Sequence, residues 1–293
     1  MNKVEIFKTD IQNHTEAQHV LAALQVELPS SIINFDLDDV EKVLRVENPP
    51  PDLDVIIRVL EKKGFLCRVI PDKVCSPSDD PSKQMKDFWE TSFQSYQVMW
   101  GLKPCRSAIN ALEIFAEKQI NSILIPGIGY GRNAQYFIEN GMTVTGIEIS
   151  SMAISLARQY YHMNCEIFNG SVTDMPFNDQ LYDGIFCYAI LHLLNKSQRR
   201  KMINDCYNQL TKGGLMIFSV VSKNSSNYGK GKKIAEDTFE IGAGAQIFFY
   251  DFETVRKDFQ DYGLTIFIEI EEPNTAASNA SFSKFILITC EKN

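Results

Sequence analysis

The stretch that decides the fold is Ile123–Arg132, with the sequence ILIPGIGYGR. Its apolar start is typical of the end of a buried strand, and three glycines follow at alternate positions: Gly127, Gly129 and Gly131. Residues 133–138 then predict the opening of a helix. A strand, a glycine turn and a helix start together present backbone N–H groups and a helix N-terminus to a ligand. Glycine suits such a turn because a Cβ would block the turn or the ligand's approach.

A second predicted strand, residues 144–149, carries an acidic residue near its end. This residue, Glu148, lies about 20 residues past the first glycine, where dinucleotide-binding folds place the carboxylate that holds ribose hydroxyls. The glycine spacing here is G-x-G-x-G, and Arg132 stands where the dinucleotide pattern has its third glycine. The pattern therefore favours a nucleoside ligand without a pyrophosphate.

The wider order of motifs resembles that of the class I S-adenosylmethionine-dependent methyltransferases. The glycine turn and the strand ending in Glu148 are followed by GSVTDMPF (170–177), YDGIFCYAILHLL (182–194) and LTKGGLMIFS (210–219). The chain closes with LTIFIEIE and SKFILITCEK, which match the family's final antiparallel hairpin. The resemblance covers residues 85–293. Within the family, FWETSFQSYQVMWGLKP (88–104) resembles the thiopurine and tellurite-resistance type of small-molecule methyltransferase.

This resemblance implies an α/β fold: a Rossmann-like, doubly wound sheet of seven strands with an antiparallel last strand. It implies S-adenosyl-L-methionine as the cofactor and a small-molecule methyl acceptor. The three glycines would approach the amino-acid part of the cofactor, and Glu148 would accept hydrogen bonds from both ribose hydroxyls. A structural alternative for Glu148 is a charge at the N-terminus of the helix that follows Ser150.

The loop after the third predicted strand should meet the adenine. In many relatives an acid directly follows the glycine of this loop, and here that position is Ser171. The backbone of Val172 and the side chain of Asp174 are therefore the candidate adenine contacts, although Asp174 could equally cap a turn. Met175 is expected to form an apolar wall.

Four further residues are candidates at the mouth of the site. Tyr188 ends the fourth predicted strand, and His192 lies one turn beyond it. We predict both as catalytic residues, with His192 as the base if the acceptor must lose a proton; the alternative is a packed helix histidine. Trp89 and Trp100 precede the glycine turn and form either a lid over the cofactor or packing between the helices and the sheet.

Residues 1–74 predict a small separate α+β unit with the order β-α-β-β-α-β, the ferredoxin-like motif. A polar linker (75–84) follows it, and residues 85–293 form the larger domain. The small unit resembles a heavy-metal-associated domain, but the loop after its first strand, Thr9–His14, lacks the two cysteines of that family. We therefore predict no metal there, and interpret the unit as an interaction module that could form a homodimer.

Composition narrows the function classes. The 293 residues carry a formal net charge of −8, which argues against a nucleic-acid phosphate backbone as the main partner. No apolar run approaches the roughly 20 residues that span a bilayer, and the first residues lack the apolar core of a signal peptide. We therefore expect no membrane partner and a cytoplasmic location. The seven cysteines are scattered, which favours reduced, buried thiols.

The segment Ser222–Gln246 is rich in glycine, asparagine and lysine, and it leaves the carboxyl end of the fifth predicted strand. It is either a flexible surface loop or a substrate lid whose lysines attract an anionic acceptor. Two rival functions stay open. A nicotinamide-dependent oxidoreductase shares the strand, glycine turn and helix, and a non-catalytic S-adenosylmethionine sensor would bind the cofactor without turnover. Nothing in the sequence names the acceptor atom.

Overall fold

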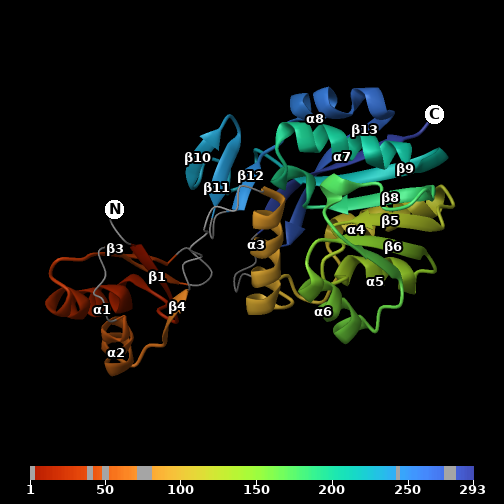
Figure 1. Ribbon diagram of the computed structural model, residues 1–293. Coiled ribbons are helices and arrows are strands. Elements are labelled where there is room, and N and C mark those ends of the chain that lie inside the picture. Colours follow the sequence, from red (N-terminus) through yellow and green to blue (C-terminus); the bar gives the residue numbers. More distant parts are fainter. Residues whose placement is uncertain (1–3, 38–41, 48–52, 71–80, 242–244, 274–281) are drawn as a thin grey trace. The chain divides into compact units, whose positions relative to one another are not determined.

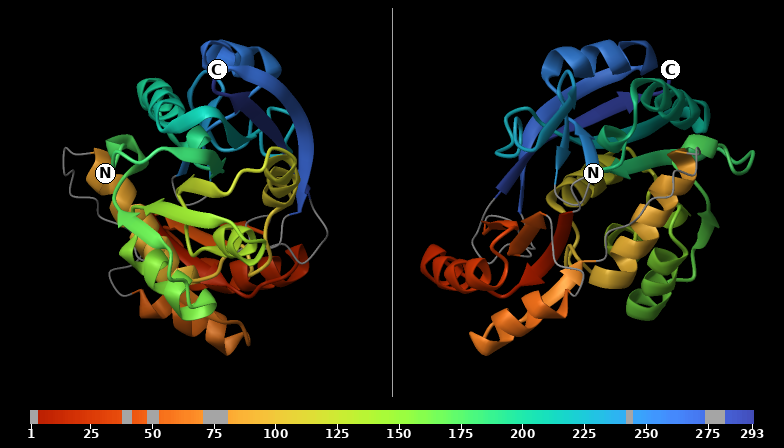
Figure 2. Two further views of the ribbon diagram at one scale, coloured as in Figure 1. Left: turned by 90° about the vertical axis from the view of Figure 1, so that its right-hand side faces the viewer. Right: turned by 60° about the vertical axis from the view of Figure 1, so that its left-hand side comes forward.

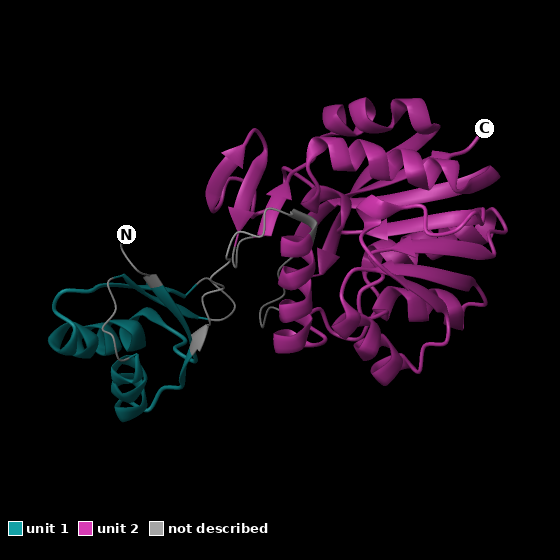
Figure 3. Cartoon of the chain, viewed as in Figure 1, with its two compact units in different colours: residues 1–77 teal, residues 78–293 magenta. Residues whose placement is uncertain are grey.

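The computed structural model describes residues 4–37, 42–47, 53–70, 81–241, 245–273 and 282–293 (Figure 1). The chain divides into two compact units, Met1–Pro77 and Ser78–Asn293 (Figure 3). Most of the predicted linker lies outside the described residues. Its last part does not: helix α3 begins at Pro81, inside the segment predicted as linker.

The first unit has the predicted order β-α-β-β-α-β: β1 (Val4–Thr9), α1 (His14–Glu27), β2 (Ile32–Asp36), β3 (Val43–Glu47), α2 (Asp54–Lys62) and β4 (Cys67–Ile70). Its antiparallel sheet has the strand order β2-β3-β1-β4. Asn13 caps α1 by accepting a hydrogen bond from the backbone N–H of Glu16, as such residues do at helix starts. Alternate strand residues such as Phe7 and Leu44 are fully buried and form its core with the two helices.

The loop after β1 is held by its own packing. Thr9 Oγ1 donates to the carbonyl of Lys42 at 2.6 Å, and Asp10 Oδ1 accepts from the N–H of Leu66 at 2.8 Å. Ile11, which follows them, is fully buried. Within the described ranges, no group of three or more His, Cys, Asp and Glu side chains is arranged to hold a metal ion.

The second unit is built on a seven-stranded sheet with the order β13-β14-β9-β8-β5-β6-β7. Strands β5 to β9 pair in parallel, while β14 runs antiparallel to both β9 and β13. This confirms the predicted fold class of the larger domain. The strands are β5 (Ser122–Pro126), β6 (Thr143–Glu148), β7 (Glu166–Asn169), β8 (Tyr182–Tyr188), β9 (Leu210–Val221), β13 (Leu264–Pro273) and β14 (Phe282–Glu291). Figure 2 shows the long pair β13 and β14, in blue, at one edge of the sheet.

Helices cover both faces of this sheet (Figure 1). One core cluster joins the strands to α4 (Arg106–Glu117) and α5 (Arg132–Glu139), and another joins them to α7 (Lys196–Asn208) and α8 (Phe252–Phe259). Helix α6 (Ser151–Tyr161) packs on β6 and β7, and α3 (Pro81–Tyr96) packs on α6. Burial on both faces explains why the central strands are continuous apolar runs. No helix among the described residues is both long and apolar enough to cross a bilayer.

The segment Ser222–Gln246 is not the loop predicted from its composition. It contains most of an antiparallel sheet of three strands, β10 (Lys232–Ala235), β11 (Thr238–Ile241) and β12 (Ala245–Phe248). We call this sheet the insert. A cluster of apolar residues that includes Val221, Phe239 and Phe249 holds the insert to the end of β9. Gly229 and Gly231 lie in the turn before β10, and Lys232 and Lys233 are exposed on β10, whereas residues 242–244 lie outside the described residues.

Candidate active site

A cavity of about 410 Å³ opens at the carboxyl ends of the parallel strands of the second unit. Residues at or just after the ends of β5, β6, β7, β8 and β9 line it, so it follows the sheet across most of its width. Ligands of open α/β sheets bind along this edge. The cavity has two halves: one over β5, β6 and β7, and one over β8, β9, β14 and the insert.

The glycine turn forms the floor of the first half. Gly127, Gly129 and Gly131 all have positive φ, from +59° to +86°. A Cβ on Gly127 would overlap the side chain of Ile190, so both the backbone conformation and the space there require glycine. Gly127 and Gly129 line the cavity, whereas Gly131 does not and instead forms the N-cap of α5.

Glu148 faces the glycine turn from the end of β6. Its two oxygens accept hydrogen bonds from the backbone N–H groups of Gly129 at 2.8 Å and Ser150 at 2.9 Å. Burial raises the pKa of Glu148 to about 7, although these N–H donors act in the opposite direction. A carboxylate offers about four acceptor positions, so two remain for a ligand in the cavity that Glu148 lines.

The loop after β7 closes the far end of the first half. Ser171 and Val172 line the cavity together with Ile149, which follows the end of β6. Ser171 caps the short helix at Val172–Asp174 by accepting from the N–H of Thr173. Asp174 is exposed and does not line the cavity, and Met175 is buried in the core. The geometry therefore weighs against the predicted adenine contacts of Asp174 and Met175, and leaves Val172.

Aromatic side chains cover the glycine turn. Trp89 and Phe93 from α3 and Trp100 line the cavity, with ring centroids about 6 Å apart. Trp100 stacks on Tyr130 at 6.0 Å, and the guanidinium of Arg132 donates to the carbonyl of Trp100 at 2.9 Å. The tryptophans thus pack against their aromatic neighbours and also line the cavity, and their action as a lid over the cofactor stays a prediction. Arg132, at the position of the missing glycine, anchors this cover.

Tyr188 and His192 both line the cavity. His192 is buried, and its Nδ1 accepts a hydrogen bond from the N–H of Val221 at 3.2 Å. Burial lowers its pKa to about 3, so the imidazole is neutral with its proton on Nε2. Neither nitrogen is then suited to receive a proton, and these contacts weigh against the predicted base. Burial raises the pKa of Tyr188 well above its ordinary value, so its hydroxyl stays protonated.

The second half of the cavity is walled mainly by apolar side chains. Phe285 of β14 stacks on Tyr188, with ring centroids 5.6 Å apart and planes 11° apart. Ile247 and Phe249 line the cavity from β12 and the residues just after it, and Ser225 lines it from the segment after β9.

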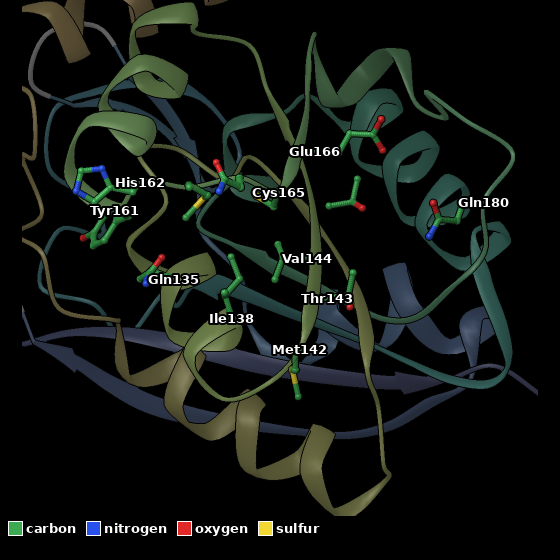
Figure 4. A pocket seen from close by; sticks show the side chains of 13 residues that line it. Gln135, Ile138, Met142, Thr143, Val144, Tyr161, His162, Cys165, Glu166 and Gln180 are labelled. Carbon is green, nitrogen blue, oxygen red and sulfur yellow. The ribbon is translucent and has the colours of Figure 1, made fainter.

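A separate hollow of about 690 Å³ lies elsewhere on the second unit (Figure 4). It is lined by residues such as Thr143 and Val144 at the start of β6, and Cys165 and Glu166 at the start of β7. These are the amino ends of the strands, opposite the glycine turn. Its position gives it no share in the chemistry of the candidate site.

Known proteins carry the same pattern. A family model described as "Methyltransferase domain" matches residues 123–214, from β5 into β9. Residues 123–214 of this chain are therefore similar to a methyltransferase domain. The match includes the glycine turn, Glu148, the loop at Ser171 and the end of β8, which are the elements that line the cavity.

Two curated proteins are similar in sequence to part of this chain. A tRNA N(3)-methylcytidine methyltransferase of Drosophila melanogaster is 28% identical over 167 residues, which is 50% of this chain and 49% of that protein. A ubiquinone biosynthesis O-methyltransferase of Coxiella burnetii is 26% identical over 121 residues, 39% of this chain and 51% of that protein. The chain thus spans about half the length of these two curated relatives.

A solved structure shares the fold. The 1,6-didemethyltoxoflavin-N1-methyltransferase of Burkholderia thailandensis, crystallised with 1,6-didemethyltoxoflavin and S-adenosylhomocysteine, has a TM-score of 0.56 at 16% identity. The match covers 77% of this chain and 98% of that one. The chain thus shares its fold with this solved structure.

Sequence reasoning missed the second half of the cavity. Ile247, Phe249 and Phe285 lie more than 100 residues beyond the glycine turn, and no motif marks them. The one usable signal was topological: Phe285 lies in the strand predicted to close the sheet. Ser225 belonged to a segment whose polar composition indicated a loop.

Proposed function

We propose that the protein is an S-adenosylmethionine-dependent methyltransferase with a small-molecule acceptor. One observation carries the proposal: a buried carboxylate, Glu148, faces a glycine turn across a cavity that continues past β8 into a second, mostly apolar half. The first half offers what a nucleoside needs, and the second half offers room for a second molecule beside it. The methyltransferase domain match supports the assignment.

The cofactor's place follows from the lining of the first half. Glu148 would accept hydrogen bonds from the ribose hydroxyls with its two remaining acceptor positions. Gly127 and Gly129 would let the methionine part lie against bare backbone. Ile149, Ser171 and Val172 would enclose the adenine, and Trp100 would cover the cofactor. The sulfonium would then lie near Tyr188, where the two halves of the cavity meet.

The reaction needs no covalent enzyme intermediate. A lone pair of the acceptor attacks the methyl carbon as the C–S bond breaks, and the electron pair of that bond stays on sulfur, giving S-adenosylhomocysteine. A proton carried by the acceptor atom leaves to water. Because His192 and Tyr188 are unsuited as bases, we assign them to shaping the cavity, and the acceleration to the alignment of the two reactants.

The same proposal covers the partner of the first unit, the kind of acceptor and the location of the protein in the cell. We assign the first unit, with its ferredoxin-like order of elements, to binding a partner protein, with a second copy of this chain as the first candidate. The negative net charge of −8 favours a small acceptor over a nucleic acid. A cytoplasmic location fits the reduced cysteines expected from the sequence.

The test begins with binding. The full-length protein is titrated calorimetrically with S-adenosylhomocysteine and, separately, with NADH. We expect S-adenosylhomocysteine to bind and NADH not to bind, and Glu148→Ala to weaken S-adenosylhomocysteine about 30-fold or more, the equivalent of about 2 kcal/mol for lost bonds to a charged group. No heat at millimolar S-adenosylhomocysteine refutes the proposal. Binding without methyl transfer to any acceptor would instead favour a sensor.

A further inference from the structure

The charged side chains that line the cavity indicate which kind of acceptor its second half can hold. The acidic and basic residues that line the cavity in the described chain are Arg132, Glu148 and Glu272. Glu148 belongs to the first half. The guanidinium of Arg132 donates to the carbonyls of Trp100 at 2.9 Å and Lys103 at 3.4 Å and lies 5.7 Å from the centre of the Tyr188 ring, so it is committed to the cover of the glycine turn. Glu272 accepts hydrogen bonds from the backbone N–H of Arg106 at 2.9 Å and of Ser107 at 2.7 Å, and from the Ser107 hydroxyl. It caps the start of α4, so its oxygens are largely committed to the fold.

The lysines of the segment Ser222–Gln246 do not supply a positive charge to the cavity. Lys223 lies 2.7 Å from both Asp237 and Asp251, and so ties the turn between β10 and β11 to the start of α8. Lys232 and Lys233 are exposed on β10 and do not line the cavity. This weighs against a lid whose lysines attract an anionic acceptor.

The insert is a fixed wall. Tyr228, Phe239 and Phe249 meet edge to face, with ring centroids 5.4 to 6.0 Å apart. The guanidinium of Arg199 in α7 lies 3.8 Å above the ring of Phe248 at the end of β12, which ties that strand to α7. The apolar face at Ile247 is therefore formed before any acceptor binds.

One polar atom in this wall has no partner. The side chain of Ser225 is 5% exposed, and its Oγ makes no hydrogen bond with any described residue. Its backbone N–H and carbonyl are both used, with Ser222 and Tyr228 respectively. A buried hydroxyl without a partner costs about 1–3 kcal/mol, and this residue lines the cavity. A ligand in the second half would supply the missing partner.

We propose that the second half of the cavity is an acceptor compartment for an uncharged aromatic molecule, whose polar substituent is held by Ser225 Oγ. This inference rests on the proposed function and names the substrate class of the same site. The stacked rings of Tyr188 and Phe285 and the side chain of Ile247 provide apolar contact for a flat ring. Ser225 provides one hydrogen bond, and no cation of the insert selects an anion.

The test uses full-length protein saturated with S-adenosylhomocysteine and three probes: 2-naphthol, naphthalene and 2-naphthoate. By calorimetry we expect 2-naphthol to bind, and 2-naphthoate to bind at least tenfold more weakly because its charge loses water without gaining a partner. Ser225→Ala should weaken 2-naphthol about fivefold and leave naphthalene unchanged. The proposal is overturned if Ser225→Ala weakens 2-naphthol and naphthalene equally. It is also overturned if the wild-type protein binds 2-naphthoate as tightly as 2-naphthol.

A second pair of variants tests the wall itself. Ile247→Glu places a charge in the compartment and should abolish binding of 2-naphthol, whereas Ile234→Glu, on the exposed strand β10 of the same insert, should not change it. The affinity for S-adenosylhomocysteine should stay within twofold in both variants. Absence of 2-naphthol binding while S-adenosylhomocysteine binds refutes the acceptor class alone. Absence of S-adenosylhomocysteine binding refutes the proposed function as well.

Discussion

The ionisation of Glu148 gives the sharpest quantitative prediction. Burial raises the pKa of its carboxyl from 4.5 to about 7 in the free protein. Ribose hydroxyls donate to the ionised form, so a bound nucleoside favours loss of the proton. With a pKa of about 7, the carboxyl is about 90% ionised near pH 8 and about 10% ionised near pH 6. The affinity for S-adenosylhomocysteine should therefore fall about tenfold between these pH values.

The assay is calorimetric titration with S-adenosylhomocysteine near pH 8 and near pH 6, in buffers of different ionisation enthalpy. Binding near pH 6 should release close to one proton. Glu148→Gln is the matched control, because the amide keeps the shape and cannot ionise; any titration of the ligand itself remains in the variant. The reasoning is refuted if the wild-type protein and the variant show the same dependence on pH.

The same pKa shift predicts how the stability of the free protein depends on pH. The folded state holds the Glu148 proton more tightly than the unfolded chain, whose carboxyl titrates near 4.5. This group therefore contributes most to stability below pH 4.5, and its contribution is lost as the pH rises through about 7. The full loss corresponds to about 3 kcal/mol. Thermal unfolding of the free protein should show this slope between those values, and Glu148→Gln should remove it.

Further predictions concern the rest of the site. Gly127→Ala should weaken S-adenosylhomocysteine at least tenfold, because its Cβ would overlap Ile190 and its φ is positive; an unchanged calorimetric affinity contradicts this. His192→Asn should leave the shape of the pH profile of the rate unchanged near pH 6.5, because burial keeps the imidazole neutral; a limb near pH 6.5 that the wild-type protein shows and the variant lacks would restore the histidine as a base. Both tryptophans of the chain, Trp89 and Trp100, line the cavity, so S-adenosylhomocysteine should change the intrinsic fluorescence in a saturable titration, and a flat titration would place the ligand elsewhere.

Much of the fold follows from local sequence. The glycine turn after β5 and the acidic residue at the end of β6 are encoded within short stretches, because positive φ and strand burial restrict which residue types fit. The antiparallel closing pair was also predictable, since β13 and β14 are two apolar runs separated by a short segment. The capping residue of α1, Asn13, follows from the same local rules.

The protonation and the partners of the site residues needed the tertiary structure. His192 looked like a base because histidine ordinarily titrates near neutral pH, but burial and the N–H of Val221 fix it as a neutral side chain. Asp174 and Met175 were placed by motif, but neither lines the cavity, because Asp174 is exposed and Met175 is buried in the core. A pattern fixes the position of a residue along the chain but not its solvation.

The sequence by itself determined the edge of the sheet that carries the glycine turn and Glu148, because that edge is made by consecutive residues in strands and turns. Only the tertiary structure decided which residues form the second half of the cavity. Ser225, Ile247 and Phe285 come from three separate segments, and they meet because β14 inserts beside β9 and the insert folds back over their ends. Contacts between distant segments depend on packing across the whole domain, so the acceptor side of the site carries no local signature.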